Sequence, residues 1–152
     1  MIPTFDDNDP EALVTLREYP CGSVFARHTH PRGQFAYAST GALRMFTDLG
    51  NWVVPPQRAV WVPGGIAHEM HMRGDVVMLN TYLDAQAAER AGLQGHCQVF
   101  EVSPLLRHLL EAALTCGASA TSEVRRHCVL TLLIDEISTL SALPLSAPLP
   151  SE

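Results

Sequence analysis

Glycine and proline interrupt residues 13–83 every eight to ten positions, and this spacing limits what the chain can fold into. Short strands at such regular intervals are typical of an all-β sandwich or barrel. The runs between the interruptions are rich in β-branched and aromatic residues. The clearest predicted strands are Gln34–Thr40, Ala42–Thr47, Arg58–Val62 and Val76–Tyr82. We therefore expect a mainly β domain over residues 1–102, which is a normal size for one domain.

Residues 103–143 differ in character, because they are rich in leucine and contain no proline after Pro104. Ser103 is a good N-cap and Pro104 suits the first helical position, so a helix is predicted from Pro104 to Gly117. A second helix is predicted over Glu123–Leu143, with Thr121 or Ser122 as its cap. Only a short loop separates these two predicted helices, and two helices joined in this way form an antiparallel hairpin.

An apolar stripe follows the second predicted helix at spacings of i, i+3, i+7 and i+10. One interpretation is that the stripe covers one end of the β domain. The interpretation we favour is a homodimer interface, because the stripe is wider than a small domain needs. The predicted interface residues are Leu130, Leu133, Ile137 and Leu140.

Residues 144–152 are proline-rich and have the composition of a linker, which suggests that another domain follows. The chain carries a net charge of −6, so it lacks the cationic face with which a protein grips DNA. Its first residues are acidic and do not form a signal peptide, and no run of 18 apolar residues could span a membrane. We therefore expect a cytoplasmic protein whose four cysteines are reduced thiols.

Three histidines have the spacing of a metal site. His28 and His30 face the same side of an extended strand, and the turn that follows them brings Gln34 onto the neighbouring strand. His68 follows a Gly-Gly turn and supplies a third imidazole from across a barrel. Three imidazoles suit zinc, nickel or non-haem iron and leave positions open for a ligand.

These two stretches resemble the paired motifs of the cupin superfamily, which implies a double-stranded β-helix, or jelly-roll barrel, followed here by the helical hairpin. In cupins the first motif supplies two histidines and a glutamate, and the second supplies a histidine. His28, His30 and His68 match those histidines, whereas Gln34 replaces the glutamate. The amide brings no charge, so a divalent ion here would keep about two positive charges and favour an anionic effector. The same change could also mark a site that has lost its metal.

A narrower resemblance rests on the run Trp52-Val-Val-Pro-Pro-Gln-Arg58-Ala-Val-Trp61-Val-Pro63 together with both histidine motifs. With these motifs the chain resembles the N-terminal sensor domain of AraC/XylS-type bacterial transcription regulators. That family implies an effector-binding, dimerising cupin domain followed by helix-turn-helix units that bind DNA. The DNA-binding part is missing from this chain, which is either an excised sensor domain or a truncated relative standing alone.

Five further residues are candidates for the effector pocket: Ala36, Ala38, Trp52, Arg58 and Trp61. The two alanines alternate with Phe35 and Tyr37, and they either leave space beside the histidines or fit the taper of a barrel. The tryptophans either line the pocket mouth or are structural. Arg58 either pairs with an effector carboxylate or forms a structural salt bridge.

The favoured function is an effector sensor in a transcription regulator rather than an enzyme. The alternatives are a stand-alone metal-dependent cupin enzyme of the dioxygenase or isomerase kind, and a small-molecule binder. A metal-free dimerisation domain would follow if Gln34 marks a lost site.

Overall fold

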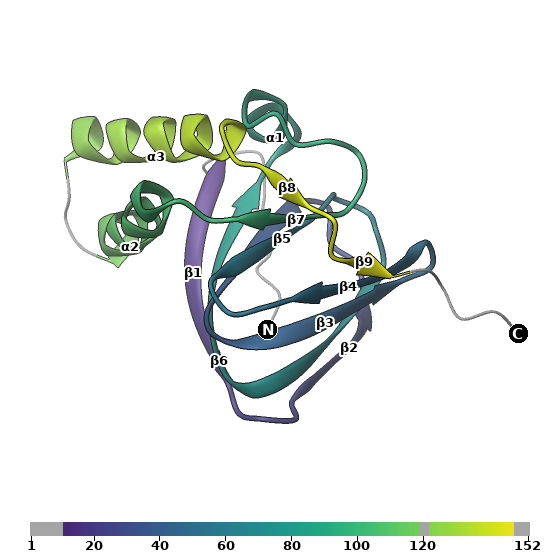
Figure 1. Cartoon of the computed structure of the whole chain (residues 1–152). Coiled ribbons are helices and arrows are strands. Elements are labelled where there is room, and N and C mark those ends of the chain that lie inside the picture. Colours follow the sequence, from purple (N-terminus) through teal and green to yellow (C-terminus); the bar gives the residue numbers. More distant parts are fainter. Residues whose placement is uncertain (1–10, 119–121, 148–152) are drawn as a thin grey trace, which may run out of the picture.

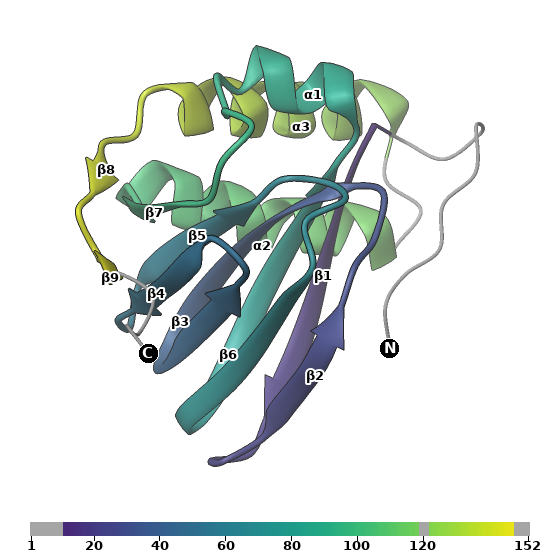
Figure 2. The same ribbon diagram turned by 90° about the vertical axis from the view of Figure 1, so that its right-hand side faces the viewer.

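The computed structural model describes residues 11–118 and 122–147 (Figure 1). In these segments nine strands join in one antiparallel sheet that curls into a barrel, with three helices on one side of it (Figures 1 and 2). The strands are β1 (Ala12–Tyr19), β2 (Val24–His28), β3 (Gly33–Thr47), β4 (Gly50–Val54), β5 (Arg58–Val62), β6 (His68–Leu83), β7 (Gln98–Glu101), β8 (Ala142–Leu143) and β9 (Ser146–Ala147).

The barrel depends on two long strands, β3 and β6, which pair with each other over most of their length. The pairing register shifts around Gly41, which has a φ of 71°, and Gly74 in β6 has the same φ. A Cβ at Gly41 would lie 2.6 Å from the carbonyl oxygen of Asp75, so glycine is required at this bend. The bend divides the β3–β6 pair into two halves, or arms. One arm pairs with β1 and β5, and β5 extends the sheet to β7 and β8; the other arm pairs with β2 and β4, and β4 extends it to β9.

Alternation along these strands separates two cores. Ala36 and Ala38 of β3 point to the barrel interior, where they pack with apolar residues of β5, β6 and β7. Phe35 and Tyr37 point outward and lie in a second core beneath the helices. The barrel wall is therefore apolar on both faces wherever a helix covers it.

The helices are α1 (Ala85–Arg90), α2 (Pro104–Ala118) and α3 (Glu123–Ser138). Ser103 caps α2, since its hydroxyl oxygen accepts from the amide of Leu106 at 3.0 Å. Ser122 caps α3 in the same way, through the amide of Arg125. These features confirm the predicted fold class, a cupin-type β barrel followed by helices. The second helix ends at Ser138, five residues before the predicted end, and α1 was not predicted. No helix in residues 11–118 or 122–147 is long and apolar enough to cross a membrane.

The predicted dimer stripe faces the protein's own core. Leu133 and Ile137 are 0% and 2% exposed, and Leu130 and Leu140 pack partly buried against the same cluster. Their contacts are α2, α1 and the outer face of the barrel wall. The structure therefore corrects the predicted interface at Leu133 and Ile137, because these two side chains are not free to bind a second copy.

The proline-rich segment is also partly inside the fold. Ala142 and Leu143 pair with β7, and Ser146 and Ala147 pair with β4, so residues 142–147 return to the sheet. The composition suggested that a free linker starts at residue 144, but residues 144–147 lie within this returning segment. Residues 148–152 of the predicted linker lie outside the described residues.

Candidate functional site

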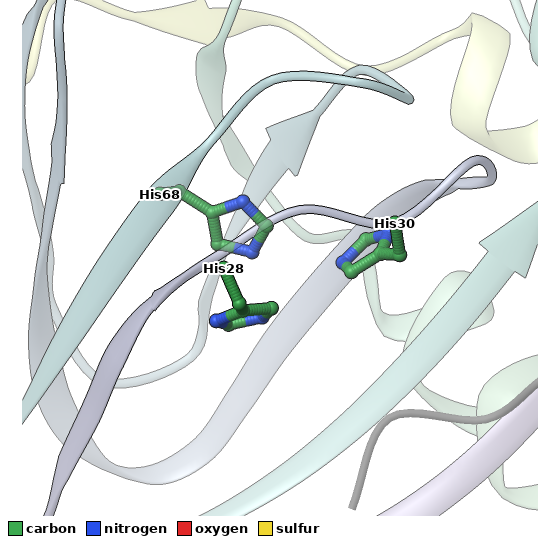
Figure 3. A group of neighbouring side chains, drawn as sticks. All are labelled: His28, His30 and His68. Carbon is green, nitrogen blue, oxygen red and sulfur yellow. The ribbon is translucent and has the colours of Figure 1, made fainter.

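The barrel brings together the three histidines that the sequence singled out. His28 ends β2 and pairs in register with His68, the first residue of β6. His30 follows in the turn between β2 and β3. The His28 and His68 rings lie 4.4 Å apart between centroids, the His30 and His68 rings 5.1 Å, and the His28 and His30 rings 5.7 Å (Figure 3). One ring nitrogen from each histidine lies within 4.8 Å of the others.

Backbone carbonyls fix the tautomer of all three rings. The Nδ1 atoms of His28, His30 and His68 donate to the carbonyl oxygens of Ala26, Arg32 and Ile66 at 2.8, 2.7 and 2.8 Å. A carbonyl oxygen only accepts, so each Nδ1 carries the proton and each Nε2 is left with a lone pair. Histidines that ligate metals are held in this way by a hydrogen bond from their other nitrogen.

His68 is the most constrained member of the cluster. Its side chain is fully buried, and its Nε2 has no hydrogen-bond partner among the described residues. Burial is the main cause that lowers the pKa of His68 to about 4; the hydrogen bond to Ile66 opposes this effect, and the neighbouring His28 and His30 contribute to it. The imidazole is therefore neutral at pH 7. A buried lone pair without a donor is a costly arrangement that a metal ion would satisfy.

Gln34 completes the cluster as the sequence predicted. Its amide nitrogen donates to Oδ1 of Asn80 at 2.8 Å, and this orients its Oε1 to within 3.2 Å of the His30 Nε2. In a neutral His30 ring with its proton on Nδ1, both of these facing atoms are acceptors. Two acceptors at this separation suit neighbouring ligands of one cation, each about 2.1 Å from it. The donor set therefore fits a divalent metal.

Asn80 was missed by the sequence reasoning. It is 2% exposed on β6, where it alternates with the interior residues Met78 and Tyr82. An amide inside an otherwise apolar strand face is the signal that could have identified it, since a buried amide needs a partner.

A small cavity adjoins the cluster inside the barrel. Besides the site residues it is lined by Tyr19, Phe25, Met70, Met78 and Tyr82. About 20 Å³ of it is open to the centres of water molecules, which is enough for an ion with little more than one water. Burial raises the pKa of Tyr82 to about 12, so its phenol stays protonated.

The predicted pocket residues do not line this cavity. Ala36 and Ala38 are fully buried in the interior core, and Trp52 packs half-buried at the edge of that core. Trp61 lies on the outer face of the barrel wall beneath the helices, where its Nε1 donates to the carbonyl of Gln94 at 2.8 Å. Trp61 is therefore structural, and its prediction as a pocket residue is corrected.

Arg58 is placed away from the histidines by the strand register. Gln34 pairs with Val62, whereas Arg58 pairs with Ala38 at the other end of β5, roughly 13 Å along the strand. Its guanidinium lies 3.9 Å from the carboxylate of Glu101. Arg58 is therefore not available to an effector bound at the histidines.

The sequence of this chain is similar to that of known proteins. A family model described as the AraC-like ligand binding domain matches residues 12–133. The HTH-type transcriptional regulator NimR from Escherichia coli K12 is 27% identical over 110 residues, which are 72% of this chain and 39% of NimR. This chain thus spans about two-fifths of the length of that relative.

Two solved structures are also similar. ToxT from Vibrio cholerae with bound unsaturated fatty acid matches with a TM-score of 0.59 and 10% identity, over 88% of this chain and 54% of ToxT. A cupin superfamily protein from Desulfitobacterium hafniense matches with a TM-score of 0.46 and 17% identity, over 55% of this chain and 74% of that one.

Acid should destabilise the metal-free protein through His68. The folded-state pKa of about 4 is below the unfolded value of 6.5, so the unfolded chain takes up the proton first. The contribution of neutral His68 to the free energy of unfolding should be present in full above pH 6.5. The free energy of unfolding should fall by on the order of 2–3 kcal/mol as the pH drops to 4. Urea unfolding in the presence of EDTA, at several pH values between 6.5 and 4, measures this change in the free energy of unfolding.

The comparison variants for this test are His68→Gln and His108→Gln. His68→Gln removes the titrating group and should flatten the pH dependence. His108 is exposed on α2, and His108→Gln should keep the wild-type slope. An unchanged slope in His68→Gln would contradict the assignment.

Proposed function

Because this chain belongs to the AraC-like ligand-binding domain family, we propose that it senses a small-molecule effector for a bacterial transcription regulator. The observation that carries the proposal is the family match over residues 12–133, which spans the barrel and reaches into α3. The resemblance to NimR supports the regulatory role. ToxT, whose fold is similar, has been seen with a bound fatty acid, which is a precedent for small-molecule binding.

We assign DNA binding to a helix-turn-helix domain of the kind that the name of NimR indicates, and not to residues 1–152. The net charge of −6 supports this division, because an acidic domain repels the phosphate backbone. A regulator of this type would act in the bacterial cytoplasm, where its DNA is.

The histidine cluster is proposed to hold a divalent transition metal, of which zinc, nickel and iron are the candidates. His28, His30 and His68 would ligate through Nε2, and Gln34 through Oε1. The metal would supply a Lewis-acidic centre with about two uncompensated positive charges. Such a centre favours an effector with an anionic group, which would enter between the partly exposed rings of Tyr19 and Phe25 and replace the water beside the ion. The rest of the effector would lie outside this small cavity.

Sensing rather than catalysis is supported by the lining of the cavity. Among the described residues, none of those that line it is a carboxylate. Glu69, the nearest acid in sequence, pairs instead with His71 outside the barrel. The Tyr82 phenol, with a pKa near 12, is a poor general base. The cavity therefore has groups to bind an effector and lacks the usual groups for proton transfer.

Binding without turnover is the direct test of this function. The zinc-loaded, nickel-loaded and iron-loaded proteins are titrated calorimetrically with acetate, oxalate and succinate, and the same samples are followed by NMR. A sensor should bind at least one of these probes and return it unchanged. Conversion of a bound probe, or oxygen uptake by the iron form, would support the cupin enzyme instead.

Metal affinity should depend on the cluster residues and on Asn80. Removing one imidazole in His68→Gln should abolish high-affinity binding of zinc or nickel in calorimetry. Asn80→Leu, which frees the Gln34 amide, should weaken binding about 10–100-fold. His71→Gln is the matched control, because His71 lies on the outer face and should leave the affinity unchanged. Equal metal content in wild type and His68→Gln would contradict the site.

A homodimer is proposed to use the outer face of α3, since the inner face is buried. Val124 and Leu132 are 74% and 43% exposed there. Leu132→Asp should shift light scattering from dimer to monomer and keep the fold. Leu133→Ala should keep the dimer and lower the free energy of unfolding by about 2–5 kcal/mol. A wild type that is monomeric at tens of micromolar would contradict this proposal.

A further inference from the structure

A second cavity lies at the end of β5 opposite to the histidines, between the barrel wall and the start of α2. Its volume is about 160 Å³, and its polar lining comes from Tyr37, Gln57, Arg58, Glu101, Ser103 and Arg107. Strand β3 contributes Tyr37, β5 contributes Arg58 and α2 contributes Arg107, so the cavity joins the sheet to the helical layer. None of its lining residues also lines the histidine cavity.

Tyr37 lines this cavity with its hydroxyl end. The residue is 2% exposed and its ring lies in the core beneath the helices. The hydroxyl has no hydrogen-bond partner among the described residues. Burial raises the pKa of Tyr37 and the negative charge of Glu111 adds to the rise, while the positive charges of Arg107 and Arg58 oppose it. The phenol therefore lies near both guanidinium groups and near one carboxylate. A hydroxyl that lines the cavity and is engaged by no described residue is free to donate to a ligand bound there.

Two arginines bring positive charge to the cavity, and of the two only Arg58 has a carboxylate of a described residue within 4.0 Å. The half-buried Arg107 guanidinium forms no hydrogen bond or ion pair with any described residue. Arg58 bonds only to the carbonyls of Pro56 and Gln57, at 3.3 and 3.5 Å, and lies 3.9 Å from the exposed carboxylate of Glu101. Both also lie beside the N-terminus of the 15-residue α2, whose dipole adds positive potential.

We propose that this cavity is an anion-binding site for the carboxylate or phosphate group of a small molecule. Arg58 and Arg107 hold the two charges, and the Tyr37 hydroxyl donates to the same oxyanion. The bound group replaces Glu101 as the partner of Arg58, and the Glu101 side chain turns to solvent. Ser103 takes no part, because its hydroxyl is engaged by Glu136 and the amide of Leu106. An anion here ties β5 to α2.

The test uses inorganic phosphate and acetate as separate probes. Each is titrated into ¹⁵N-labelled, metal-free protein at constant ionic strength with chloride as the balancing anion, and amide shifts are followed by NMR. Saturable shifts centred on Gln57, Arg58, Ser103 and Arg107 are expected for at least one probe. Response to phosphate alone identifies a phosphate site, and response to acetate alone identifies a carboxylate site. Shifts that are absent, or that do not saturate, overturn the proposal.

Four variants separate a binding site from a structural role. Arg107→Gln should weaken binding of the active probe about tenfold or more, and Tyr37→Phe should weaken it by a smaller factor. Glu101→Gln should tighten binding several-fold, because the competing carboxylate is gone; a purely structural Arg58–Glu101 pair predicts no gain. The matched control is Arg125→Gln, which removes the same charge from an exposed position on α3. Equal weakening by Arg107→Gln and Arg125→Gln overturns the proposal.

Discussion

The pairing of β3 with β6 is the constraint on which the rest of the structure depends. These strands carry Gln34, His68 and Asn80, and their bends at Gly41 and Gly74 let one pair of strands serve two arms of the sheet. Because side chains alternate along a strand, the same backbone supports the histidine cavity on its inner face and the helices on its outer face. The histidine cavity and the helices therefore share one layer of backbone between them.

Preorganisation of the three imidazoles follows from the turns rather than from contacts between the rings. Each Nδ1 donates to a carbonyl two residues away, so the short segments around Ala26, Arg32 and Ile66 set both tautomer and direction. The arrangement leaves acceptor atoms converging without a donor, most clearly at the buried His68. A buried acceptor without a donor is unfavourable, and this conflict between local hydrogen bonding and burial is the physical basis for the proposed metal site.

Local sequence signals predicted local features well. The histidine spacing, the caps at Ser103 and Ser122, and strand β5 were all recognisable, because each depends on neighbouring residues. Periodicity identified the apolar face of α3 but could not say what covers it, and the cover is the protein's own core. Likewise, alternation on β5 separates Trp61 from Val60 without revealing which side is inside. The two-residue strands β8 and β9 are too short to have a pattern.

The charge at position 34 would determine which ligands a metal in the proposed site favours. With a glutamate there, one negative charge would offset part of the charge of a bound divalent ion, and a neutral ligand such as water would compete well for the open positions. With Gln34 held by Asn80, the ligand set is neutral, and an anionic group gains the full attraction of the ion in a low-dielectric interior. If the proposed metal is bound, the neutral Gln34–Asn80 pair would favour an anionic ligand over a neutral one at this site.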